Sequence, residues 1–295
     1  MTDVPTSPRG GTLGAAGLVL VGLICQDIGA ASAVTLFPHV GALGMVTLRL
    51  VFSAAILFIA FRPRLRGRSR ADWLTVIAFG FALALMNGLF YEAIARLPLG
   101  ITVTIEVLGP LILSVVVSRK ASAWLWAVLA FIGVAIFGWG GWDHLDPIGV
   151  AFAVAAGTMW VAYILLSART GRRFERLDGL AIAMSIGALG AIPFGIISAG
   201  PPLFHIDILL LGVVVAVLSS AIPYGLELLA LRRLPAATFS ILMSLSPAIA
   251  ATAGLIILHQ ALTVPDAVAI ALVVVASIGA VRSADRRQPE IVVTP

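Results

Sequence analysis

The sequence predicts an all-α polytopic membrane protein with ten transmembrane helices, arranged as two inverted five-helix repeats (5+5). Three observations predict this fold: an apolar composition, ten apolar stretches of membrane-spanning length, and a motif that recurs at one offset. Of the 295 residues, 60% are apolar and 11% are charged, whereas soluble domains have about 45–50% apolar and about 25% charged residues. A soluble fold could not cover this much apolar surface, so the lipid bilayer is the expected environment.

Ten apolar stretches are expected to cross the bilayer as helices. Most are close to the roughly 20 residues that span about 30 Å of hydrocarbon. In chain order they cover residues 13–35, 41–61, 72–95, 98–118, 122–138, 147–167, 178–198, 206–230, 235–257 and 264–282. Such continuous runs differ from the alternating strands of about ten residues that form outer-membrane barrels.

The basic residues alternate between the predicted loops and thereby predict the orientation. One set of loops and ends contains 17 of the 19 basic residues: Arg9, Arg62, Arg64, Arg66, Arg68, Arg70, Arg119, Lys120, Arg169, Arg172, Arg173, Arg176, Arg232, Arg233, Arg282, Arg286 and Arg287. The other set contains only Arg96, and Arg49 lies within a span. Because cytoplasmic loops are enriched in Lys and Arg, both termini are predicted to be cytoplasmic, which requires an even number of crossings. The prevalence of Arg over Lys favours a bacterial source, and hence the inner membrane.

An internal repeat accounts for the division into two halves. The motif Arg-Leu-Pro at 96–98 recurs at 233–235, and Pro110 recurs as Pro247 at the same offset of 137 residues. This offset covers five spans, an odd number, so the second half enters the membrane in the opposite sense. Inverted repeats are common in secondary transporters. The predicted units are a tail at 1–12, repeats at 13–138 and 147–282, and a tail at 283–295.

Three ionisable residues are predicted to lie deep in the membrane. Arg49 and Glu106 each lie about eight residues, or about 12 Å, into a span, and Asp27 lies at similar depth. Such residues usually face a protein interior or a watery cavity. Pro110 lacks the N–H that would bind the Glu106 carbonyl, so the helix should kink there. Two alternatives stay open: a structural ion pair of Arg49 with Asp27, and a kink at Pro110 that only shapes the bundle.

Further candidates for a binding site are polar or aromatic residues within the spans. Asn87 and Tyr91 share a helix face, and Ser244 precedes the expected kink at Pro247. The remaining candidates are Tyr224 and Glu227 beside a kink at Pro223, and Trp160 and Tyr163, for which aromatic packing is the alternative. Glu92 and Arg96 are predicted to form a local surface pair, because they are four residues apart near a helix end.

No enzymatic motif is present in the sequence. It contains no GxSxG, HExxH, Walker A or CxxC pattern. Cys25 is the only cysteine, and the four histidines are scattered. We therefore expect neither an enzyme nor a metal site nor a cofactor. The net charge of +5 is explained by membrane orientation rather than by nucleic-acid binding.

Several segments resemble the drug/metabolite transporter superfamily, and specifically the threonine/homoserine exporter branch of its EamA-type members. The likeness runs from about residue 13 to 282 and is carried by the segments at 47–50, 86–91, 97–101, 105–110 and 222–227. The resemblance implies efflux of small amino acids driven by the proton gradient. Asp27 and Glu92 depart from the branch, where uncharged residues are usual at these positions, and this puts the exact substrate in doubt.

The charged residues suggest how a zwitterionic amino acid could bind. Arg49 could bind the carboxylate through two hydrogen bonds, and Glu106 or Asp27 could bind the ammonium group or exchange a proton. The expected partners are thus a small polar amino acid, protons and the lipid bilayer, and a homodimer is left open. The alternatives are efflux of another metabolite or a drug, such as a purine or a drug-like cation, and a membrane scaffold or enzyme subunit.

Overall fold

The computed structural model describes residues 9–118, 121–137, 145–175, 177–231, 234 and 236–285, and within them the side chains except those of 9–13, 118, 121–123, 224, 228, 231, 236–237 and 283–285. All regular structure in these ranges is helical. The helices are α1 (Arg9–Phe61), α2 (Arg70–Ile94), α3 (Leu99–Glu106), α4 (Leu108–Ser118), α5 (Ala121–Ile136), α6 (Pro147–Gly171), α7 (Asp178–Ala199), α8 (Ile206–Ala216), α9 (Ile222–Leu231), α10 (Ala236–Met243), α11 (Ser246–Ile257) and α12 (Val264–Asp285). A 3₁₀ turn covers Pro201–Phe204, and a π-helical turn covers Val217–Ala221.

Alone or in consecutive pairs, most of the helices have the length and composition of membrane spans. Eight segments of the described chain are long and apolar enough to cross a bilayer, and Trp124–Ile136 is a shorter apolar helix. The first segment, Gly14–Phe61, has 48 residues, which corresponds to about 72 Å of helix, more than twice the hydrocarbon thickness. It bends at Gly41, where φ is 68° and ψ is 172°, a backbone conformation that glycine adopts easily. The predicted spans 13–35 and 41–61 are thus joined without a loop.

Two of the predicted spans are broken in the middle. The span 98–118 forms α3 and α4, separated at Val107, and the span 235–257 forms α10 and α11, separated at Ser244 and Leu245. Pro110 and Pro247 follow these breaks by a few residues and cannot supply the backbone N–H of a continuous helix. Pro223 likewise follows the π-helical turn between α8 and α9. All three prolines therefore coincide with interruptions of regular helix.

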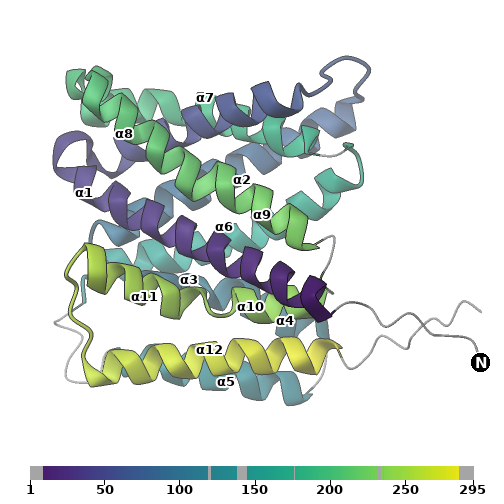
Figure 1. Cartoon of the computed structure of the whole chain (residues 1–295), viewed down its shortest axis with the longest axis vertical. Coiled ribbons are helices and arrows are strands. Elements are labelled where there is room, and N and C mark those ends of the chain that lie inside the picture. The colour runs from purple at the N-terminus through teal and green to yellow at the C-terminus, as the bar shows by residue number, and fades with distance from the viewer. Residues whose placement is uncertain are drawn as a thin grey trace, which may run out of the picture.

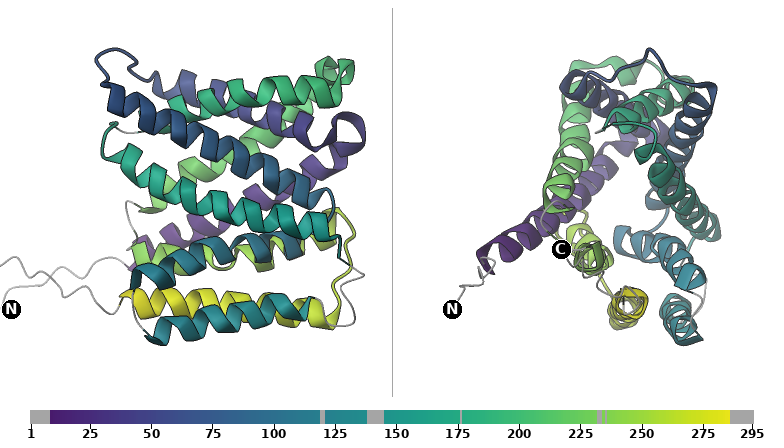
Figure 2. Two further views of the ribbon diagram at one scale, coloured as in Figure 1. Left: turned by 180° about the vertical axis from the view of Figure 1, so that it is seen from behind. Right: turned by 90° about the vertical axis from the view of Figure 1, so that its right-hand side faces the viewer.

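The helices pack into one bundle around a central region. The pairs with the most extensive contacts are α1 with α7, α2 with α6, and α5 with α12, the last of which lies at the bottom of Figure 1. The right-hand view of Figure 2 shows an arch of helices, with purple α1 and green α8–α9 on one side and teal α6 on the other. Helices from both halves of the chain thus surround the middle of the molecule.

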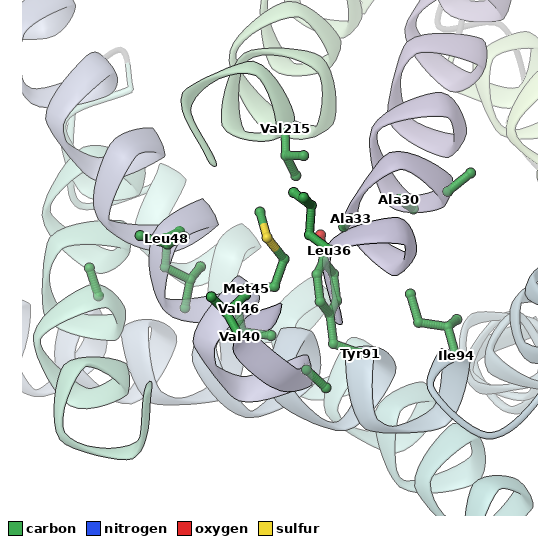
Figure 3. Packing of buried hydrophobic residues seen from close by; sticks show 14 of the residues in the cluster. Ala30, Ala33, Leu36, Val40, Met45, Val46, Leu48, Tyr91, Ile94 and Val215 are labelled. Carbon is green, nitrogen blue, oxygen red and sulfur yellow. The ribbon is translucent and has the colours of Figure 1, made fainter. Parts of the chain in front are cut away.

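The surface is apolar and the interior contains many small residues. Large apolar side chains point outward from most helices, including Ile59, Leu74, Phe81, Phe131, Ile197 and Ile256. The core contains many alanines, as is usual where membrane helices approach one another closely. One buried cluster, shown in Figure 3, surrounds the ring of Tyr91 with Leu36, Met45 and Val215. The apolar outer surface fits a protein that is surrounded by lipid.

Two glycines allow α4 and α6 to touch beside Glu106. A Cβ atom on Gly157 would lie 2.6 Å from the carbonyl oxygen of Glu106, and one on Gly109 would overlap the carbonyl oxygen of Gly157. Both positions therefore require glycine for the observed packing. By contrast, a Cβ on Gly88 of α2 would meet no atom within 4 Å.

We expect Gly157→Ala to lower the melting temperature of the purified protein by several degrees. The added methyl group must displace the backbone at Glu106, and such overpacking typically costs about 1–3 kcal/mol. Gly88→Ala is the matched control and should melt at or slightly above the wild-type temperature, because alanine has the higher helix propensity. Thermal unfolding of the three proteins in detergent measures the difference. Equal melting temperatures for Gly157→Ala and Gly88→Ala would contradict the close contact of α6 with the end of α3 at Glu106.

Candidate functional site

A cavity of about 180 Å³ lies among seven of the helices. It is smaller than the roughly 300–1,000 Å³ of typical pockets for drug-sized ligands. Seven residues singled out from the sequence line it: Asp27, Arg49, Asn87, Glu106, Trp160, Tyr163 and Glu227. They come from α1, α2, α3, α6 and α9. The fold thus gathers these polar and charged groups from distant parts of the chain around one small space.

Arg49 is held from two sides by groups other than carboxylates. One guanidinium nitrogen, Nη1, lies 3.4 Å from the Tyr91 hydroxyl, and Nη2 donates to the carbonyl oxygen of Ser219 at 3.2 Å. The guanidinium carbon also lies 5.4 Å from the centre of the Tyr91 ring. The Ser219 carbonyl can accept this bond because Pro223, four residues later, lacks the N–H that would otherwise bind it. The kink at Pro223 therefore creates an acceptor for Arg49.

The sequence left open a structural ion pair between Arg49 and Asp27, and the described residues do not form one. Their ion pairs lie near helix ends instead: Arg68 with Asp178 at 3.6 Å, Arg173 with Asp72 at 2.9 Å, and Arg96 with Glu92 at 2.5 Å and with Asp146 at 3.7 Å. The predicted local pair of Glu92 and Arg96 is thereby confirmed. Within the described part of the chain, Asp27 Oδ2 and Arg49 Nε are buried without a hydrogen-bond partner.

Glu106 and Asp27 are both nearly inaccessible, with exposed fractions of 8% and 3%. Glu106 ends α3 at the break before α4. Its carboxylate interacts electrostatically with Arg49 and with Asp27, attractively with the first and repulsively with the second. The cavity therefore contains a guanidinium and two carboxylates that influence one another across α1 and α3.

Two predicted binding residues, Tyr91 and Ser244, do not line the cavity in the described structure. Tyr91 is fully buried behind it and supports Arg49. Ser244 is buried and donates to the carbonyl of Ser240 at 3.0 Å. The turn at 244–245 re-aims the chain, so that Ser246 lines the cavity instead. Tyr224 lies in α9, and its side chain is outside the described residues.

The aromatic residues of α6 combine the two roles considered for them. Trp160 and Tyr163 both line the cavity, and the Tyr163 ring also packs against Phe79 at 5.3 Å between ring centres. Asn87 is buried beside them, and its amide nitrogen donates to the carbonyl of Leu83 at 2.8 Å. These side chains give the cavity a partly apolar lining beside its charged groups.

Sequence reasoning missed two polar side chains of the cavity, Gln26 and Ser246. Gln26 directly precedes Asp27, and only the charged residue of this pair was selected as a candidate. Ser246 directly precedes Pro247, which was selected only as a helix kink. The Ser219 carbonyl was missed as well, although its signal was present. The rule that identified the free carbonyl four residues before Pro110 identifies Ser219 four residues before Pro223.

Comparison with known proteins identifies the family. The sequence model of the EamA-like transporter family matches residues 147–282. The threonine/homoserine exporter RhtA of Salmonella typhimurium strain LT2 is 39% identical over 276 residues, which cover 93% of each chain. RhtA of Escherichia coli strain K12 is 39% identical over 264 residues and 89% of each chain. The chain belongs to the EamA-like transporter family.

A crystal structure described only as that of a protein has a similar fold, with a TM-score of 0.62 over 96% of this chain and 100% of the solved chain, at 18% identity. As a member of the EamA-like transporter family, the chain is a multi-pass membrane transporter and not an enzyme. The resemblance drawn from the sequence segments is confirmed. In this EamA-like chain, the cavity offers groups for both ends of a zwitterion.

Proposed function

We propose that this EamA-like transporter exports small amino acids of the threonine and homoserine type, by proton-coupled antiport with alternating access. The observation that carries the proposal is the cavity that brings Arg49 and Glu106 together among helices of both halves. The relatives named threonine/homoserine exporter support the substrate class. The small volume of the cavity suits an amino acid better than a drug-sized compound.

Arg49 binds the substrate carboxylate and Glu106 binds the ammonium group. A planar guanidinium suits a carboxylate because it donates parallel hydrogen bonds, and Tyr91 and Ser219 fix its position. Glu106 lines the same cavity as Arg49 and interacts with it electrostatically, so the two residues offer opposite charges to the two ends of an α-amino acid. Uncharged polar groups of Gln26, Asn87 and Ser246 remain to bind a side-chain hydroxyl.

Proton coupling follows from competition for Glu106. A buried carboxylate is costly in its charged form unless a cation accompanies it, so Glu106 binds either a proton or the substrate ammonium group. Among the described residues, the other charged groups that line the cavity are Arg49, Asp27 and Glu227, and Asp27 is the second candidate for the exchanged proton. Export of one substrate would thus accompany the entry of a proton.

Ten crossings in two inverted repeats are part of this proposal. The breaks at Val107 and Ser244 are 137 residues apart, the same offset as the recurring motif, and the family match covers residues 147–282, the second proposed unit. The bend at Gly41 divides the longest helix into two crossings. The basic residues support an inner-membrane protein with cytoplasmic termini.

Uptake of labelled threonine into inverted membrane vesicles tests the function. In such vesicles an exporter carries substrate into the lumen, and a lumen made acidic should drive accumulation, because protons leave as threonine enters. A protonophore should abolish the accumulation, and vesicles without the protein provide the background. Absence of threonine uptake with or without a pH gradient would reject the proposed substrate class, and uptake of a labelled purine or drug-like cation alone would favour the alternative.

A cysteine-labelling experiment tests the orientation. We expect Leu65→Cys, in a Cys25→Ser background, to resist an impermeant thiol reagent in intact cells, because the loop 62–69 is predicted to be cytoplasmic. Leu65 is exposed, whereas Ser69 is unsuitable because its side chain accepts a hydrogen bond from Asp72 N and caps α2. Ala261→Cys at the opposite end should react rapidly. The reverse pattern would invert the orientation.

A further inference from the structure

The cavity contains more negative than positive side chains. Arg49 is its only cationic residue in the described structure, whereas Asp27, Glu106 and Glu227 each supply a carboxylate from a different helix. A zwitterionic substrate adds one charge of each sign and leaves this imbalance unchanged. Because buried carboxylates need a compensating positive charge or a proton, the cavity has acceptors beyond those that a single ammonium group uses.

Asp27 is a deeply buried carboxylate of the cavity. It is 3% exposed and lines the cavity, and its Oδ2 has no hydrogen-bond partner among the described residues. Arg49 does not compensate it, since the guanidinium donates to Tyr91 and Ser219. A buried carboxylate with an unpartnered oxygen fits a site that binds a cationic group of the substrate.

The charged side chains of the cavity can each take one charge of a diamino acid. Under the proposed function, Arg49 takes the carboxylate and Glu106 the α-ammonium group, and both line the same cavity as Asp27 and Glu227. Of the two remaining carboxylates, Asp27 is buried, with one oxygen that lacks a partner among the described residues, whereas Glu227 is only partly buried. Asp27 is therefore the carboxylate that fits a second, side-chain ammonium group.

We propose that the cavity also accepts α-amino acids with a second ammonium group, such as ornithine, and that Asp27 binds this group. The inference rests on the proposed export of amino acids through the same cavity. It extends the substrate class from neutral hydroxy amino acids to small diamino acids.

Transport of labelled ornithine and labelled threonine by the same inverted vesicles tests the inference. We expect the wild-type protein to transport both, and Asp27→Asn to lower the ornithine-to-threonine ratio by about tenfold or more, as expected for the loss of a hydrogen bond between charged groups. A ratio is insensitive to the amount of folded protein. Glu92→Gln is the matched control: it removes a carboxylate that pairs with Arg96 outside the cavity, and the ratio should stay at the wild-type value.

Ligand-induced thermal stabilisation of the purified proteins gives a second readout, independent of coupling. Ornithine and threonine should both stabilise the wild type, and Asp27→Asn should lose more of the response to ornithine. Wild-type transport of threonine alone would overturn the inference and leave the proposed function intact, whereas transport of neither would reject both. An unchanged ratio in Asp27→Asn, a loss of both ligands, or a ratio that falls in Glu227→Gln instead would overturn the role of Asp27.

Discussion

Arg49→Lys is expected to reduce threonine transport by about 10- to 100-fold while the protein still inserts into the membrane. Lysine keeps the positive charge but is a point charge with no planar fork. The arginine contacts the Tyr91 hydroxyl and the Ser219 carbonyl at the same time and still has donors for a carboxylate. A lysine cannot make all these bonds, and a hydrogen bond between charged groups is worth about 1.5–3 kcal/mol. Initial rates in inverted vesicles, normalised to the amount of protein, measure the effect.

Arg96→Lys is the matched control for this substitution. Arg96 pairs with Glu92 and Asp146 near a helix end, and exposed pairs of this kind contribute little. Its transport rate should stay close to that of the wild type. If Arg49→Lys also transports at the wild-type rate, the hypothesis that Arg49 binds the carboxylate through two hydrogen bonds is wrong, and a single positive charge is sufficient.

Glu106→Gln is expected to abolish the acceleration of transport by a pH gradient. Glutamine has nearly the shape of glutamate but cannot release a proton, so substrate and proton no longer compete at this position. Accumulation of threonine in vesicles with an acidic lumen should fall to the rate without a gradient. Exchange of internal for external threonine should persist at a reduced rate, because it requires no net proton movement.

The two assays on reconstituted vesicles separate the possible roles of Glu106. Gradient-driven transport at the wild-type rate would move proton coupling to Asp27 or Glu227, which face the same cavity. A variant that no longer folds would instead support a structural role at the break between α3 and α4. Glu92→Gln should retain both activities, because Glu92 pairs with Arg96 at the surface.

Much of the fold followed from apolar runs and prolines in the sequence. Helix length and composition depend on local sequence, so the spans and the interruptions near Pro110 and Pro247 were predictable. The bend at Gly41 was predicted only as a boundary between spans, because nothing local shows that the helix runs on through 36–40 without a loop. The number of crossings also depends on regions beside the helix ends, where the sequence signal is weakest.

The site was predictable where charge made a residue conspicuous. Arg49, Asp27 and Glu106 are costly in lipid, so their presence in apolar runs pointed to an interior cavity. Ser244 was chosen because it precedes the expected kink at Pro247. The interruption begins earlier, at the turn of residues 244–245, so that Ser246 lines the cavity instead. Tyr91 was chosen as a binding residue because it shares a helix face with Asn87. Its contact with Arg49 and its complete burial depend on packing by distant helices, which one sequence does not reveal.

The bend at Gly41 has a kinematic consequence for the cavity. Asp27 lies 14 residues before this pivot, and Arg49 lies eight residues after it. At about 1.5 Å per residue, these positions are lever arms of about 21 Å and about 12 Å. If the first half of α1 rotates by about 10° about Gly41, the part of the helix that carries Asp27 moves by about 4 Å, while the two halves stay joined at Gly41. Rotation of the two halves of α1 about Gly41 would thus increase or decrease the distance between Asp27 and Arg49. The displacement is largest at the end of the molecule away from Gly41.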